Sequence, residues 1–447
     1  MRCVLAVLGV LVMAGCAARS PYDRIYVSHS IEERTGHSLA PATRPQEAYL
    51  PAGVSLDDGL TEDEAVAVAL WNNPQFQVDL TELAFARADL ASAGLLPNPL
   101  VSYLRLFGIK GTEAYVLWPL DALWQRPKRV AAAKYNARRV ADGLVQHGLA
   151  LGRDVLIAYA DLDLAEKEAA LVREDARVRQ EIAGLAAARF RSGDISGLEE
   201  SAARLDALRS EDEALRAARD AATARTRFAA LLGFGDTLPT LTLTPTPDIA
   251  TDGRPLPELL AAAQAVRPDL RAAQIEIEAA GARLGWERAM IIKFTATLDA
   301  KEKGEAGMFA GPSAKIEIPI FNRNEGGRAR ARAEMERAAT RYVAVRQAIA
   351  AEVRSAHAEV EAARQSVKIF DDDIVPGAAA AALQARKAYA IGEESYLFVL
   401  EAEHRELDIR RRAAEALADL RRAGARLKCA LGFSTTGQSP AAGPTTR

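Results

Sequence analysis

Apolar residues recur at three- and four-residue spacing across most of the chain between Pro127 and Pro239, an interval without an internal proline. This spacing is typical of amphipathic helices. The pattern breaks at RSGDISG, residues 191–197, where glycine, aspartate and serine supply turn chemistry. From Pro127 to this turn the helix would exceed sixty residues and reach roughly 90 Å at about 1.5 Å per residue. Ordinary globular domains do not need a helix of that length.

Another helical pattern begins at Thr61, whose sequence T-E-D-E combines an N-cap residue with acidic residues in the first turn. The pattern runs to about Ala93 and then meets the stretch AGLLPNPLVSYL, residues 93–104. Pro97 and Pro99 forbid the helix to continue, and the Leu, Val, Ser and Tyr residues that follow favour a strand. We therefore predict an abrupt change from helix to strand at this point.

Alternation of apolar and polar residues predicts two pairs of short strands, at about 98–120 and about 291–321. It is clearest from Ile292 to Lys301, where even-numbered positions are apolar and odd-numbered positions polar, over the length of a tilted transmembrane strand. The first pair is less regular, with Leu100, Leu104 and Leu106 on one face beside Ser102, and Ala114, Val116 and Trp118 along the other strand. Half-buried strands of a soluble sandwich alternate in the same way, so this alternative stays open for a single hairpin.

Several sequence motifs occur twice along the chain in the same order. The repeated motifs are Pro74-Gln75-Phe76 with Pro268-Asp269-Leu270, Trp118-Pro119-Leu120 with Ile318-Pro319-Ile320, Gly193, Ser196 and Leu198 with Gly392, Ser395 and Leu397, and Leu232-Gly233 with Leu431-Gly432. The later three pairs lie 199 or 200 residues apart, which indicates two copies of one unit. We predict a first repeat at 60–232, a Pro- and Thr-rich connector at 233–256, a second repeat at 257–433 and a disordered tail at 434–447.

The N-terminus predicts export and a lipid anchor. Residues 1–15 combine a basic start, a short apolar run and small residues before Cys16, which is typical of a secretory signal peptide. Met-Ala-Gly-Cys resembles the bacterial lipobox, so we expect Cys16 to carry a covalent lipid such as palmitate; the alternative is a plain signal followed by an incidental cysteine. Ala17 and Ala18 lack the Asp of inner-membrane retention, which favours the outer membrane. Residues 16–59, polar with scattered prolines, predict an extended tether.

Composition excludes several function classes. The chain has 57 basic and 60 acidic residues spread along it, a net charge of -3, so we expect solvated helix faces and no nucleic-acid partner. Removal of the signal leaves Cys16 and Cys429, and no intrachain disulfide is possible if Cys16 is lipidated. The sequence contains no phosphate-binding loop or nucleophile motif, and we predict that the protein is not an enzyme. Glu401 and His404 have ligand-like spacing, but a metal site needs further ligands, and we predict none.

Four strands of this kind must be completed by neighbouring chains. Four strands cannot close a barrel, and open sheet edges are not tolerated in lipid. We predict a mainly α protein with a small β part, whose oligomer joins the hairpins into one transmembrane β-barrel and the long helices into a coaxial tunnel. The polar positions of the second hairpin would then line the barrel lumen: Lys293, Thr295, Thr297, Asp299, Lys315 and Glu317.

Five stretches carry a resemblance to a known family. They are LTEDEAVAVALWNNPQF (60–76), ASAGLLPNPLVSYL (91–104), RPDLRAAQIEIEAA (267–280), IPIFNRNEGGRARARAEME (318–336) and AYAIGEESYLFVLEAEHREL (388–407). With them the chain resembles the TolC family of outer-membrane efflux channels. This resemblance implies a homotrimer with a shared 12-stranded β-barrel and a periplasmic α-barrel of twelve helical segments. The sequence IPIFNRNEG is most like the corresponding sequences of family members that serve heavy-metal or small-molecule efflux pumps.

The resemblance also implies roles for the ends of the helical hairpins. In this family the periplasmic turns close the channel and contact an adaptor protein that bridges to an inner-membrane pump; here the turns contain Gly193, Ser196, Gly392 and Ser395. Ordinary helix-turn chemistry explains the glycines equally well. The two carboxylates that ring the family's aperture align with Phe398 and Glu401. Glu401 would give a ring of three negative charges, Phe398 a hydrophobic constriction, and the alternative for Glu401 is a solvated helix face.

We therefore predict the passive outer-membrane exit duct of a tripartite efflux system, anchored by lipid and opened at its periplasmic tip by an adaptor and a pump. Two alternatives stay open. One is an exit duct for type I protein or peptide secretion, and the other is a lipid-tethered periplasmic coiled-coil scaffold without a pore.

Overall fold

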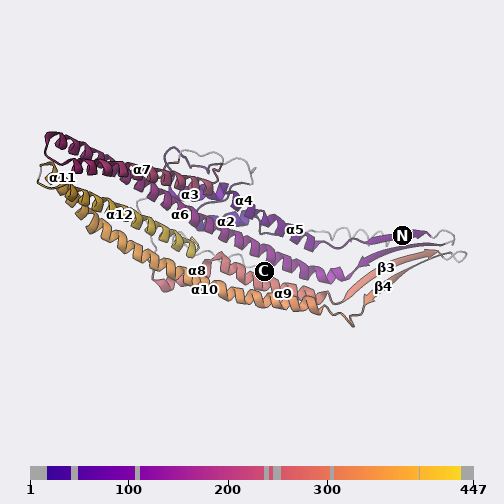
Figure 1. The fold of residues 1–447 in the computed structure, drawn as a ribbon. Helices are drawn as coiled ribbons and strands as arrows, with labels where there is room; N and C mark the ends of the chain where they lie inside the picture. Colours follow the sequence, from indigo (N-terminus) through magenta and orange to yellow (C-terminus); the bar gives the residue numbers. More distant parts are fainter. Residues whose placement is uncertain are drawn as a thin grey trace. The chain divides into compact units, whose positions relative to one another are not determined.

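A computed structural model describes residues 18–41, 49–105, 111–235, 241–244, 253–302, 307–391 and 393–433. Long helices dominate, and the strands form a single sheet (Figure 1). The chain divides into two compact units, which are described separately. Unit 1 comprises the N-terminal segment to Ser30, Val78–Gln146 and Arg267–Ala348, and unit 2 comprises Ile31–Gln77, His147–Val266 and the chain from Ile349 onward.

Unit 1 contains a four-stranded antiparallel sheet. Its strands are β1 (Leu100–Arg105), β2 (Thr112–Pro119), β3 (Lys293–Glu302) and β4 (Met308–Glu317), in the order β1-β2-β3-β4. The two hairpins, which come from distant parts of the sequence, join where β2 pairs with β3, with Tyr115 opposite Asp299. Both predicted hairpins are confirmed, although β4 ends at Glu317, before the predicted limit of about 321.

Helices α5 (Glu82–Gly94), α9 (Pro268–Ala289) and the first parts of α6 (Asp121–Ser192) and α10 (Glu325–Ile369) complete unit 1. The predicted end of the helix before Pro97 is confirmed, because α5 stops at Gly94. Arginines of α6 donate hydrogen bonds to the last carbonyl groups of α5: Arg126 Nε donates to Gly94 O at 2.6 Å, and Arg129 Nε donates to Ala93 O at 2.9 Å. The end of a helix leaves such carbonyls without intrahelical partners, so these side chains stabilise the transition from helix to strand.

The predicted single helix from Thr61 to Ala93 is three helices, α3 (Glu62–Asn72), α4 (Pro74–Leu80) and α5. The predicted start is confirmed, since Thr61 and Glu64 form a capping box. The helix is interrupted because Pro74 has no N–H group and disfavours helical geometry at Asn73. The apolar period continues across the break, and for this reason the sequence pattern did not reveal it.

The predicted extended tether at 16–59 is wrong for part of its length. Residues Arg24–Thr35 form helix α2, and Val27 and Ile31 on this helix are fully buried. A side chain at Gly148 of α6 would meet Ile31 at 2.7 Å, so the glycine allows α2 to pack closely on α6. The polar composition concealed an apolar i, i+4 pair that tertiary packing buries.

Unit 2 consists of helical hairpins. It contains α7 (Gly197–Leu231), α8 (Leu256–Val266), α11 (Val375–Ala390) and α12 (Tyr396–Ala430), together with the later parts of α6 and α10 and a short π-helix, η2 (Phe370–Ile374). Helices α7 and α12 each have 35 residues and are each followed by a glycine at positive φ, Gly233 and Gly432. At Gly233 a Cβ atom would meet the carbonyl oxygen of Asn72 at 2.5 Å, so this turn requires glycine.

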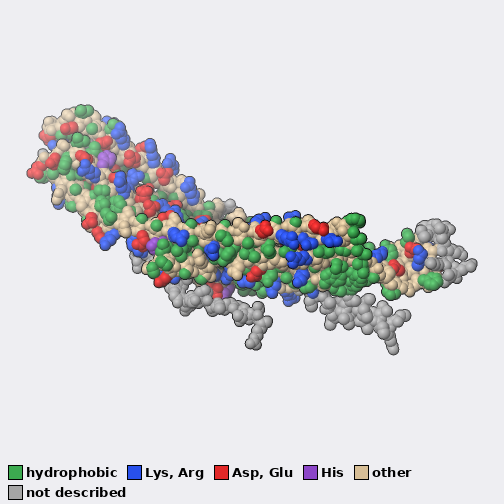
Figure 2. Space-filling model, turned by 90° about the horizontal axis from the view of Figure 1, so that it is seen from below, with side chains coloured by type: hydrophobic (Ala, Val, Ile, Leu, Met, Phe, Trp, Pro, Cys, Tyr) green, Lys and Arg blue, Asp and Glu red, His purple; other side chains and the backbone are tan. Residues whose placement is uncertain are grey.

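Charged side chains of both signs are interspersed over the helices on the face seen in Figure 2. This distribution matches the solvated helix faces that the balanced composition predicted. No helix in the described part of the chain is both long and apolar enough to cross a membrane.

Candidate functional site

The sheet of unit 1 has one polar face. Directly opposed residues of antiparallel strands point to the same side, and the register pairs Lys293 with Glu317 and Thr295 with Lys315. Lys293 Nζ lies 3.0 Å from Glu317 Oε2, and Ser313 donates a hydrogen bond to Asp299. Thr297 lies between these pairs and is buried. The structure thus brings the six residues predicted to line a lumen onto one side of β3 and β4.

The opposite face of the sheet is apolar and open to solvent. Leu298 of β3 is 55% exposed and Ile316 of β4 is 60% exposed. On β1 this face carries Val101 and Tyr103, because Val101 pairs with Val116 and Tyr103 with Ala114. As predicted, Leu100 and Leu104 share one face of β1 with Ser102, and this face belongs to the polar side of the sheet. Leu106 lies outside the described residues.

The first predicted tip turn joins α6 to α7 in unit 2. Gly193 has φ of 84°, and Asp194 N–H donates to Arg189 O at 2.9 Å, as in the glycine motif that ends many helices. Ser196 is the N-cap of α7, and its Oγ accepts a hydrogen bond from Glu199 N–H at 3.3 Å. The predicted turn chemistry therefore has a structural function in ending one helix and starting the next.

The second predicted turn, between α11 and α12, repeats this geometry. Glu393 N–H donates to Ala388 O at 2.9 Å, 199 positions after the corresponding bond of Asp194. Ser395 is the N-cap of α12 but makes no side-chain cap, and Gly392 lies outside the described residues. The two turns lie close together, since the guanidinium of Arg189 sits 5.2 Å from the ring centre of Tyr389. Exposed apolar side chains surround them: Phe190, Leu198, Ile391 and Leu397.

The two predicted aperture residues lie in the first turns of α12, one helical turn apart. Phe398 is half exposed. Glu401 is also exposed, but its Oε1 lies 2.5 Å from Arg405 Nη2. Because Arg405 offsets the charge, the structure does not leave Glu401 as an isolated negative group. A solvent-exposed pair of this kind contributes little to stability and can separate easily.

Of the pair with ligand-like spacing, Glu401 lies beside Arg405 and His404 beside another arginine. His404 faces Arg179 of α6, whose two terminal nitrogens lie 3.3 and 3.4 Å from the two ring nitrogens. Arg179 in turn bonds the buried carboxylate of Asp175 at 2.6 Å. Within the described residues, no three His, Cys, Asp or Glu side chains lie close enough together to hold a metal ion.

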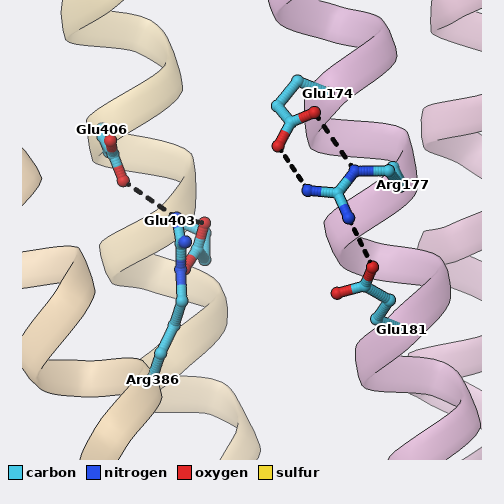
Figure 3. A network of polar contacts seen from close by, with 6 residues as sticks. All are labelled: Glu174, Arg177, Glu181, Arg386, Glu403 and Glu406. Atoms are coloured by element: carbon cyan, nitrogen blue, oxygen red, sulfur yellow. Dashed lines mark hydrogen bonds and ion pairs between the residues drawn. The ribbon is translucent and has the colours of Figure 1, made fainter.

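Sequence reasoning missed a buried charge network beside the second turn. In Figure 3, Arg386 of α11 extends to two carboxylates of α12, Glu403 and Glu406. Both glutamates are buried, and Glu406 also pairs with Arg410. The hydrogen bond with Glu403 raises the pKa of Arg386 above its usual value. The network therefore links the two arms of this hairpin by buried charge.

A sequence signal for this network exists on α12. Its buried stripe contains Val399, Glu403, Glu406 and Leu420, and the first three follow the four- and three-residue spacing of a coiled-coil core. Two glutamates at positions where apolar residues are expected indicate that a cation must pack against them. By contrast, Arg177 in Figure 3 joins Glu174 and Glu181 on one exposed surface of α6.

Comparisons with known proteins agree with this architecture. The chain matches the model of the family described as outer membrane efflux protein over residues 111–234 and 259–433. It is 26% identical over 374 residues to the cobalt-zinc-cadmium resistance protein CzcC of Cupriavidus metallidurans, covering 83% of this chain and 87% of that protein.

Two solved structures show the same fold. A membrane protein from Pseudomonas aeruginosa superposes with a TM-score of 0.72 at 19% identity, over 88% of this chain and 98% of that one. The open state of the Neisseria gonorrhoeae MtrE outer membrane channel gives 0.68 at 18% identity, over 88% and 98%. The family match spans well over half of the sequence and confirms the resemblance to TolC-like channels. The chain belongs to the outer membrane efflux protein family.

Proposed function

We propose that three copies of this chain form the passive exit duct of a tripartite efflux system in a Gram-negative outer membrane. The observation that carries this proposal is the two-faced sheet. Its apolar face is exposed, its polar face is linked by ion pairs and hydrogen bonds, and β1 and β4 are open edges. Such a sheet is stable in lipid only if other copies pair with both edges and close a barrel with the polar face inward.

The ends of the helical hairpins are the proposed periplasmic gate. Phe398 would narrow the aperture, and Glu401 would contribute negative charge whenever Arg405 moves away from it. The two turns, with the exposed apolar residues around them, would contact the adaptor protein. Their shared backbone geometry supports one adaptor contact at each turn, because the repeated hydrogen bonds present similar surfaces.

We propose divalent transition-metal ions as the cargo. The support is the similarity to CzcC, whose name specifies resistance to cobalt, zinc and cadmium. The duct itself would need no resident metal site, since an inner-membrane pump selects and drives the cargo. A covalent lipid on Cys16, which lies outside the described residues, would hold the N-terminal segment at the membrane.

Complementation with a metal-accumulation assay tests this function. In a host that lacks the gene but retains its adaptor and pump, the wild-type chain should lower cell-associated zinc, cobalt or cadmium. A chain with Leu298→Lys, which places a charge on the apolar face, should fail to do so. Restored growth on hydrophobic drugs without any change in metal content would contradict the proposed cargo. Secretion of a protein through the same system would contradict efflux of small solutes.

A further inference from the structure

Four helices of unit 1 line a cavity of about 650 Å³. They are α5, α6, α9 and α10, which run alongside one another towards the sheet (Figure 1). Contacts join neighbouring helices in this order: Arg129 of α6 donates to Ala93 O of α5, Trp124 of α6 donates to Ala289 O of α9, and Arg283 of α9 pairs with Glu334 of α10. A row of four helices brings its first and last members to one cavity only where the row curves, so the cavity lies on the concave side.

Small residues provide the space for this cavity. Four alanines line it where α6 and α9 meet: Ala132, Ala133, Ala279 and Ala280. Each contributes only a methyl group, so a hollow remains between the longer side chains around them. These longer side chains are mostly charged. The volume falls within the range of sites that hold small molecules in proteins.

Three of the lining arginines have no carboxylate partner in the described part of the chain. Arg129 donates to backbone carbonyl groups at the end of α5, at 2.9 and 2.6 Å. Arg139 donates to the amide oxygen of Asn136 at 3.1 and 3.3 Å. Arg337 is exposed, and no hydrogen bond or ion pair joins it to another described residue. None of these acceptors carries a charge, so all three positive charges stay uncompensated.

The carboxylates of the cavity do not supply the missing partners. Two of the three lining carboxylates already pair with other arginines: Glu334 with Arg283 at 3.4 Å and Arg330 at 3.2 Å, and Glu276 with Arg341 at 3.6 Å. The third, Asp89, lies on α5 and forms no ion pair with a described residue. The unpaired groups are therefore three guanidinium groups and one carboxylate, which leaves the cavity positively charged.

Two of the unpaired arginines lie close together along the helix axes. Two contacts between each pair of neighbouring helices fix their relative levels: Trp124 with Ala289 and Asp142 with Arg271 between α6 and α9, and Arg283 with Glu334 and Glu276 with Arg341 between α9 and α10. By these contacts Asn136 lies at the level of Ile277, and Arg337 at the level of Ala280. Because Arg139 reaches back to Asn136, its guanidinium and Arg337 differ by about three residues, or about 5 Å along the axis. These two long side chains, from either side of α9, can therefore meet one ligand.

The indole of Trp286 also lines the cavity. Its Nε1 is buried and has no acceptor among the described residues. A buried donor of this kind in a native protein is normally explained by an ordered water or an ion. Trp286 therefore gives a second indication, independent of the charges, that a group with acceptor oxygens enters this cavity.

We infer that this cavity binds a compact polyanion, a solute with two or more phosphate or carboxylate groups. Guanidinium groups donate paired hydrogen bonds that match the oxygens of phosphates and carboxylates. Arg139 and Arg337 hold the ligand from the two sides of α9, and Arg129 adds positive charge. The same charges repel free divalent cations, so the ligand is not the proposed metal cargo itself.

The concave position places this site inside the proposed duct. When copies of the chain close a wall of helices into a tube, the concave side of the wall faces the lumen. Three copies then present three such sites around the path of the cargo. This placement rests on the proposed function, whereas binding of the anion by unit 1 does not.

Isothermal titration calorimetry with inorganic pyrophosphate tests the site on the full-length protein in detergent. The wild-type chain should bind pyrophosphate. Arg337→Gln and Arg139→Gln should each weaken binding about tenfold, because each removes a hydrogen bond between charged groups. The matched control is Arg332→Gln, which removes the same charge from an exposed position of α10 outside the cavity. The control should leave the affinity unchanged.

Tryptophan fluorescence locates the bound ligand. Of the four tryptophans, Trp286 is the one that lines the cavity. Pyrophosphate should change the emission of the wild-type protein. Trp286→Phe should lose this change, while calorimetry still detects binding through the arginines.

Three results would overturn the inference. The first is a wild-type protein that does not bind pyrophosphate. The second is equal weakening by Arg332→Gln and Arg337→Gln, which would indicate a non-specific effect of surface charge. The third is a fluorescence change that persists in Trp286→Phe, which would place the ligand elsewhere. Conductance in a bilayer separates the two proposals: a conducting oligomer that does not bind pyrophosphate refutes only this site, and a protein that binds pyrophosphate but never conducts refutes the duct.

Discussion

Asp142 of α6 has no exposed surface, and two side chains share one of its oxygens. The hydroxyl of Tyr26 on α2 donates to Oδ1 at 3.0 Å, and Arg271 Nη2 lies 3.0 Å from the same atom. A buried carboxylate is costly unless it is paired and hydrogen-bonded. This arrangement therefore fixes α2 on the helices of unit 1 and gives the N-terminal segment a docking point ten residues after Cys16 in the sequence.

The Tyr26 contact predicts alkaline release of α2. Burial, followed by the charge of Asp142, raises the pKa of Tyr26 to about 12 from a usual value of 10.0. Because the neutral phenol is favoured in the folded state, its contribution to docking is complete below about pH 10 and is lost as the pH rises towards 12. Limited proteolysis of the N-terminal segment should accelerate in this window. In Tyr26→Phe the acceleration between pH 10 and 12 should be absent, and an unchanged profile would contradict the role of Tyr26.

Arg386 and Arg177 provide a matched test of buried against exposed charge. Arg386→Ala leaves Glu403 and Glu406 buried with less compensation, and should lower the free energy of unfolding by about 1–3 kcal/mol. Arg177→Ala removes pairs that lie in solvent, and should lower it by less than about 1 kcal/mol. Urea denaturation followed by circular dichroism measures both changes. Equal effects of the two substitutions would show that burial of the glutamates does not control stability here.

At the level of elements, the spacing of apolar and polar residues correctly predicted the strands and turns that local chemistry determines. The strands of the second hairpin followed from strict alternation, and the turn at 191–197 followed from glycine and serine spacing. The pattern failed at α2, and it did not specify which side of β1 joins the apolar face of the sheet, because packing or pairing with distant residues decides both. Which of these residues lie on the apolar face, Leu100 and Leu104 or Val101 and Tyr103, depends on how β1 pairs with β2. No local sequence signal specifies this register.

The two-faced sheet predicts opposite effects of the same charged side chain. Leu298→Lys places a charge on the proposed lipid side, where lysine costs about 2–4 kcal/mol at the bilayer midplane. Ser313→Lys places it on the polar side, next to Asp299, and should be tolerated. The yield of heat-modifiable oligomer in outer-membrane fractions measures assembly. Equal yields for the two variants would contradict the assignment of the faces.

At the scale of the whole molecule, the family was predictable from the sequence, and the charge pairing at the proposed gate was not. Open strand edges and a four-stranded count already required neighbouring chains. The ion pair of Glu401 with Arg405, four residues later on the same helix, was not predicted. The family resemblance implied a role only for the carboxylate of Glu401. The buried Arg386 network was missed because its members lie on two helices.

Conductance across a planar lipid bilayer tests the central claim most directly. Purified full-length oligomer, added to a bilayer, should produce discrete current steps, and Phe398→Ala should raise the conductance of the closed channel because it removes the proposed constriction. Leu298→Lys, purified in the same way, is the control for protein that does not insert. An intact trimer that gives no current, even with Phe398 and Glu401 both replaced by small residues, would contradict the account.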